Sequence, residues 1–85
     1  WDGKWHLIIF DIPESKKNAR YALSRKVREL GLYPLQKSVL VSPYRCRDEV
    51  DFIGEFFGVR NHIIYITADE IEGAEKVKRH FGVLE

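Results

Sequence analysis

The sequence has one cysteine, no methionine and no long apolar run. The lone Cys46 excludes an internal disulfide and suits a reducing cytoplasm. No apolar run approaches the roughly 18 residues that span a membrane, and no signal peptide is visible, so we expect a cytoplasmic protein without membrane contact. Because a native chain starts with methionine, we expect residues 1–85 to form a single domain of a longer chain.

Several common catalytic and cofactor motifs are also absent. No glycine-rich stretch matches a P-loop or a dinucleotide-binding fingerprint. The three histidines lack the spacing of metal ligands, and one cysteine cannot supply a zinc set. Arg45 and Arg47 flank Cys46 and should lower the pKa of its thiol. Since the sequence places no histidine beside Cys46, we interpret it as a loop cysteine and not as a nucleophile.

The charged residues are unevenly distributed along a chain whose net charge is only +1. Residues 1–47 carry ten basic and four acidic side chains, whereas residues 48–85 carry four basic and nine acidic ones. This asymmetry predicts a cationic face that meets nucleic acid or an acidic partner. The alternative is that the two halves pair with each other, in the monomer or across a dimer.

The apolar run at residues 7–10 predicts a strand over 7–12 that is buried on both faces. Pairing should stop near Ile12, because Pro13 has no N–H to donate. Residues 14–30 then show helical periodicity, and Gly31 supplies a stop. The apolar stripe of this helix consists of Ala19, Leu23, Val27 and Leu30.

The other face of the predicted helix is strongly basic. Like charges on one helix repel, so pairing within the helix does not explain them, although a charged face is often simply solvated. The cations on this face are Lys16, Lys17, Arg20, Arg25, Lys26 and Arg28. We predict nucleic-acid contacts from most of them and from three later cations. The full predicted set is Lys16, Lys17, Arg20, Arg25, Arg28, Lys37, Arg45 and Arg47.

Residues 32–43 have strand character between Pro34 and Pro43. The phase of the apolar residues changes near Lys37 and Ser38, which predicts either two short antiparallel strands or one bent strand. The absence of glycine and of an Asn-Gly pair argues against a conventional two-residue hairpin turn.

Three further elements complete the chain. Residues 48–57 predict a short helix, and residues 62–68 predict a strand rich in β-branched side chains. Residues 69–81 predict a final helix, with Asp69 and Glu72 as its capping box. The order of elements predicts an α+β fold, a ferredoxin-like βαββαβ sandwich with an added C-terminal helix.

Asp11 ends the first strand and has two possible roles. It can cap the first helix or accept a backbone N–H in the turn. Alternatively, a two-fold axis near this strand end would bring two Asp11 side chains together to share a cation with phosphate oxygens, as phosphodiester hydrolysis needs. The residues alone favour the first role.

The residues around Asp11 resemble those of a known family. Asp11 after an apolar strand, Arg20, Leu23 and Gly31 along the helix, and residues 35–39 (Leu-Gln-Lys-Ser-Val) resemble the small CRISPR-associated Cas-two family. This resemblance implies a ferredoxin-like dimer that acts as a metal-dependent nuclease or as a structural partner of the spacer integrase. It also implies that Asp11 is catalytic and binds Mg²⁺, with one aspartate from each subunit.

The opening of the chain resembles something more specific. Residues 1–5 (Trp-Asp-Gly-Lys-Trp), running into residues 10–14 (Phe-Asp-Ile-Pro-Glu), resemble the central domain of PaaX-type transcriptional repressors. That domain has a Cas-two-like fold and follows a winged helix-turn-helix. Together the two resemblances cover about residues 1–68. Leu40 and the helix predicted at 69–81 depart from the Cas-two pattern, and both departures argue against nuclease activity.

These features predict a homodimeric, Cas-two-like domain of a PaaX-like transcriptional regulator that associates with DNA or RNA through its basic helix. The alternative is a CRISPR-associated, Mg²⁺-dependent endonuclease or spacer-integration subunit, with Asp11 as metal ligand and the spacer integrase as partner. A third interpretation is a dimeric scaffold that makes no nucleic-acid contact. The fold does not decide among them, because one fold hosts many functions.

Overall fold

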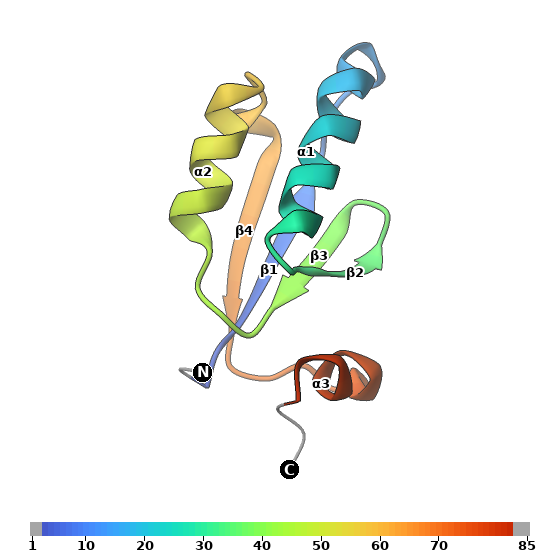
Figure 1. Ribbon diagram of the computed structural model, residues 1–85, viewed down its shortest axis with the longest axis vertical. Coiled ribbons are helices and arrows are strands. Elements are labelled where there is room, and N and C mark those ends of the chain that lie inside the picture. Colours follow the sequence, from blue (N-terminus) through green and yellow to red (C-terminus); the bar gives the residue numbers. More distant parts are fainter. Residues whose placement is uncertain (1–2, 83–85) are drawn as a thin grey trace.

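The computed structural model describes residues 3–82 (Figure 1). The strands are β1 (Trp5–Phe10), β2 (Tyr33–Gln36), β3 (Val39–Ser42) and β4 (Ile63–Ala68). The helices are α1 (Lys17–Glu29), α2 (Arg47–Phe56) and α3 (Glu75–Phe81), with 3₁₀ turns η1 (Glu14–Lys16) and η2 (Arg60–His62). The strands form one antiparallel sheet in the order β2-β3-β1-β4. The predicted ferredoxin-like α+β fold with an added C-terminal helix is therefore confirmed.

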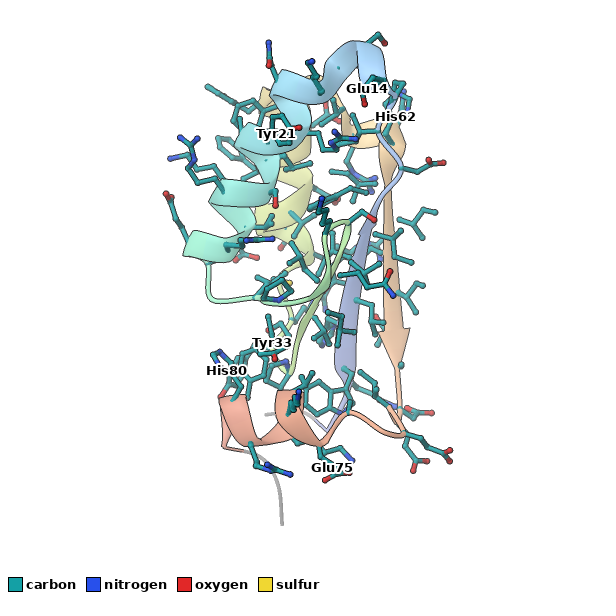
Figure 2. All side chains as sticks on the ribbon, turned by 90° about the vertical axis from the view of Figure 1, so that its right-hand side faces the viewer. Glu14, Tyr21, Tyr33, His62, Glu75 and His80 are labelled. Carbon is teal, nitrogen blue, oxygen red and sulfur yellow. The ribbon has the colours of Figure 1, made fainter. Side chains whose placement is uncertain are left out.

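Helices α1 and α2 lie on the same side of the sheet, which we call the helix-covered face (Figures 1 and 2). On the opposite side, the open face, the described residues place α3 alone against the sheet: it packs at the lower end, with Trp5, Leu7 and Val41. No helix in the described part of the chain is long and apolar enough to cross a membrane.

Strand β1 occupies the interior of the sheet, between β3 and β4. It ends at Phe10, two residues earlier than the predicted end at Ile12. Ile8 and Phe10 are buried beneath the helices, but Leu7 and Ile9 alternate with them onto the open face and are only partly buried. The prediction of burial on both faces is wrong, because both long helices cover the same side.

The main core lies between the helix-covered face and the two long helices. Its buried residues are Ile8, Phe10, Ile12, Leu23, Val27, Leu32, Leu40, Cys46, Val50, Val59 and Ile63. The predicted stripe of α1 contributes Leu23 and Val27, both fully buried. Leu30, the last member of that stripe, is 45% exposed because α1 ends at Glu29. Burying each large apolar side chain contributes about 1.5–3 kcal/mol, so the core residues of α1 fix this helix against the sheet.

Strands β2 and β3 form a hairpin, so the prediction of two short strands is the correct alternative. Only Lys37 and Ser38 separate the paired residues Gln36 and Val39, but their turn is not a conventional hairpin turn, as the absence of glycine and of Asn-Gly predicts. No described residue other than glycine has a positive φ, so this turn is not one of the primed types that demand Asn-Gly. A register irregularity between Pro34 and Gln36 accompanies it.

Helix α3 is shorter than predicted, because it begins at Glu75 and not at Asp69. The expected capping box is wrong, since Asp69 instead forms an ion pair with Lys4, and α3 has no side-chain cap. The helix packs through Val77 on Trp5, whose ring centroid lies 6.5 Å from that of Phe81. Trp5 therefore belongs to a second buried cluster, beneath α3, while Trp1 lies outside the described residues.

Candidate functional site

A group of polar and cationic side chains lies between α1 and the β2–β3 turn. Residues four apart on a helix share a face, so Arg20, Ser24 and Arg28 line up along α1 toward the turn that carries Lys37. These elements enclose a cavity of about 460 Å³, which we call the α1 pocket. Its lining residues are Arg20, Tyr21, Ser24, Arg28, Lys37 and Ser38.

The α1 pocket has an excess of positive charge. Within residues 3–82, Arg28 and Lys37 make no ion pair, and Arg20 has only Glu14, at 3.7 Å between Nη2 and Oε2. The Arg20 guanidinium also lies 5.2 Å from the centre of the Tyr21 ring, which is 58% exposed. Two guanidiniums, an ammonium and three hydroxyl groups therefore face a cavity that no carboxylate lines, an arrangement that suits a phosphate group.

The structure brings together in this pocket three of the eight residues predicted to bind nucleic acid: Arg20, Arg28 and Lys37. Lys16, Lys17 and Arg25 are exposed beyond it, and Lys16 donates to the Gly58 carbonyl oxygen at 3.5 Å. The lysines lie at the upper end of α1 (Figure 1), so they extend the cationic surface along the helix and do not enclose the cavity.

Arg45 and Arg47, the remaining two residues predicted to bind nucleic acid, lie elsewhere. They flank the start of α2, at the lower end of that helix (Figure 1), and line a separate cavity of about 240 Å³ together with His6, Tyr65 and Thr67. We call this cavity the His6 pocket. The eight cations therefore form two groups and not one continuous face.

A hydrogen-bond network that the sequence did not reveal lines the His6 pocket. The Tyr65 hydroxyl accepts a hydrogen bond from the Cys46 backbone N–H at 3.1 Å and lies 2.9 Å from His6 Nδ1. His6 is nearly fully buried, and its partner in the register of β1 with β4 is Thr67. Because only this strand pairing brings His6 beside Tyr65, no local sequence signal predicts the network.

The expectation that two arginines lower the pKa of Cys46 is wrong. Burial raises the pKa of the thiol, and the charge of Glu49 raises it further, against a hydrogen bond from Tyr65 that lowers it. The Cys46 Sγ atom lies 3.7 Å from the Tyr65 hydroxyl, and Tyr65 lies between it and His6. Burial therefore favours the thiol over the thiolate, while the interpretation of Cys46 as a loop cysteine and not as a nucleophile stays a prediction.

Burial also raises the pKa of Tyr65 to about 12, from an ordinary value of 10.0. A spectrophotometric titration should show one tyrosine that ionises near pH 12, and Tyr65→Phe should remove that component. Tyr44→Phe, at an exposed tyrosine, should leave it in place. Because the unfolded chain releases this proton first, the free energy of unfolding should fall as the pH rises from about 10 to about 12. Persistence of the late component in Tyr65→Phe would contradict the assignment.

Asp11 does not cap a helix. Its side chain is exposed, and neither η1 nor α1 has a side-chain hydrogen bond at its N-cap, so the capping interpretation is wrong. Its backbone N–H donates to the His62 carbonyl oxygen at 2.8 Å, which extends the pairing of β1 by one bond. No cluster of three or more His, Cys, Asp or Glu side chains that could hold a metal ion occurs among residues 3–82. A lone carboxylate does not fit a magnesium site within one chain, and the shared site across a dimer stays a prediction.

Comparison with known proteins identifies the family. A family model described as the PaaX protein central Cas2-like domain matches residues 1–79. No curated protein and no solved structure matches significantly. The match includes all four strands and most of α3, so it extends beyond the 68 residues covered by the predicted resemblance. The chain belongs to the family of PaaX central Cas2-like domains.

Proposed function

We propose that this domain contacts DNA within a PaaX-like transcriptional regulator, and that the α1 pocket is the contact site. The convergence of Arg20, Arg28 and Lys37 on one cavity carries the proposal. Cations that share a cavity repel one another, and a bound anion relieves that repulsion. The hydroxyl groups of Ser24 and Ser38 add neutral donors beside them, as phosphate oxygens require.

The cations outside the pocket favour a nucleic-acid backbone over an isolated phosphate. The 13 residues of α1 make a helix about 20 Å long, which spans several phosphates of one strand. Lys17 and Arg25 are exposed on the same helix and extend the positive surface beyond the cavity. These contacts would hold the backbone without reading bases, so the domain would position DNA while sequence is read elsewhere.

We also propose that the domain is a homodimer that associates through the open face. The open-face residues of β1 and β4 are apolar, and they include Ile64 and Ile66, which are 50% and 40% exposed. Leu7 and Ile9 lie opposite them across the strand pair and are half-buried. An apolar patch of this kind is complementary to a second copy of itself, because a two-fold axis places the same patch on both partners.

The DNA contact predicts a steep salt dependence. With three phosphate contacts, affinity for a random-sequence duplex should fall about 40-fold between 50 and 200 mM salt. The variant Arg20→Gln/Arg28→Gln/Lys37→Gln should lower affinity at 50 mM salt by a similar factor. It should also make the slope of log K against the logarithm of the salt concentration shallower by about 2–3. Fluorescence anisotropy measures both quantities, and a parallel RNA duplex determines which nucleic acid is preferred.

A control variant with the same change in net charge tests whether position matters. Lys26→Gln/Lys76→Gln/Arg79→Gln removes three cations that lie outside the α1 pocket, on the side of α1 that faces α2 and on α3. This control should keep most of the affinity and the salt slope. Equal weakening by both triple variants would show that only net charge matters, and a wild-type affinity that does not depend on salt would favour the scaffold interpretation.

A further inference from the structure

We propose that the His6 pocket binds a small oxyanion, the phosphate or carboxylate group of a low-molecular-weight ligand. The pocket lies between the start of α2 and the sheet, apart from the α1 pocket. All five of its lining residues are polar, and two of them are the arginines that the DNA contact does not use. The two sites share no residue, so the proposal stands independently of the proposed function.

The charges that line the pocket are of one sign. Arg45 and Arg47 make no ion pair with any residue between 3 and 82, whereas Arg60 is held by Asp51 at 2.7 Å. The acids at the start of α2 do not fill this role. Neither Asp48 nor Glu49 lines the His6 pocket: both line a cavity beside Leu30 and Phe52, and Glu49 shares a further cavity with Arg45 and Cys46 without forming an ion pair with Arg45. The missing counter-charge is therefore expected to come from a ligand.

The pocket is also organised in advance. The Tyr65 hydroxyl is held between the Cys46 N–H and His6 Nδ1, so its position does not depend on a ligand. The Arg47 guanidinium lies 5.9 Å from the centre of the Tyr65 ring, which orients it beside the cavity. Because Tyr65 and Arg47 are already held in place, ordering them on binding costs little conformational entropy, so even a small ligand gains affinity from the pocket.

The size and depth of the pocket favour a small ligand over a nucleic-acid backbone. Its volume of about 240 Å³ is several times that of a phosphate or carboxylate group, so it accommodates such a group together with the body of a small ligand. His6, which lines it, is only 3% exposed, so a group that reaches it must leave bulk solvent. The phosphates of a duplex lie on its convex surface, so they cannot reach a buried residue such as His6.

Nuclear magnetic resonance titrations test the proposal on the 85-residue chain. Inorganic phosphate and acetate are titrated separately, each against chloride at equal ionic strength. We expect saturable shifts at the backbone amides of Cys46, Arg47 and Tyr65 with at least one of the two oxyanions and not with chloride. If only one oxyanion produces saturable shifts, that result assigns the ligand class.

Variants of the pocket should weaken binding in a graded way. Arg45→Gln/Arg47→Gln should raise the Kd for the oxyanion at least about 10-fold, because two charged hydrogen-bond donors are lost. Tyr65→Phe keeps the ring and removes only the hydroxyl, and it should weaken binding less. The matched control Arg20→Gln/Arg28→Gln should leave the shifts at Tyr65 unchanged. Shifts confined to α1, or shifts that do not saturate, would overturn the proposal.

Discussion

Replacing Leu40 by alanine should lower the free energy of unfolding by about 3–4 kcal/mol, the loss expected for a leucine in a core that cannot collapse around the deletion. Leu40 is fully buried in β3 and pairs with Ile8 of the central strand. A domain of this length has a total stability of roughly 4–13 kcal/mol, so this one change removes a large part of it. Urea unfolding followed by circular dichroism measures the shift of the midpoint at constant m value.

The control for this prediction is Leu35→Ala in the neighbouring strand. Leu35 is 39% exposed and does not belong to the core clusters. Its truncation should cost less than about 1 kcal/mol. Both variants must be compared at one protein concentration, because a dimer adds an association term to the measured stability. Equal losses at the two positions would contradict the burial of Leu40 between sheet and helices.

The elements with a strong local pattern were predictable from the sequence. The interior strand β1, the helix α1 with buried Leu23 and Val27, and the strand β4 are each indicated by runs and periodicities of apolar residues. The start of α3 was not predictable, because its apparent capping motif is locally plausible. Distant contacts decide the start instead, since Asp69 pairs with Lys4, and Ala74, which directly precedes the helix, is buried in the cluster around Trp5.

The candidate site, too, was predictable only as far as patterns within single elements allow. Spacing along a helix places Arg20 and Arg28 on one face, but only the hairpin brings Lys37 to them across the cavity. Arg45 and Arg47 lie apart from this group. Their charge alone could not predict this, because it carries no information on where the start of α2 lies relative to α1. Periodicity determines the faces of single elements, whereas the grouping of side chains from different elements depends on strand order and register.

The open face results from the placement of both long helices on one side of the sheet. A sheet with only one covered face must solvate or pair the other, and antiparallel sheets usually place polar residues there. In this chain β1 and β4 carry apolar residues on that face instead, and α3 covers only its lower end, around Trp5 and Val41. The part left open includes Ile64 and Ile66 of β4 and is the surface proposed for dimerisation.

Ile64→Lys should therefore raise the dissociation constant of the homodimer at least about 100-fold, because a lysine at the centre of an apolar interface must be desolvated without a partner. Sedimentation equilibrium over a range of concentrations measures this constant. The matched control is Phe56→Lys, which places the same charge at a 75% exposed aromatic residue on α2, on the other side of the sheet. It should leave the dimer intact. Loss of the dimer in Phe56→Lys but not in Ile64→Lys would move the interface to α2, and a monomeric wild type at high concentration would remove the proposed assembly altogether.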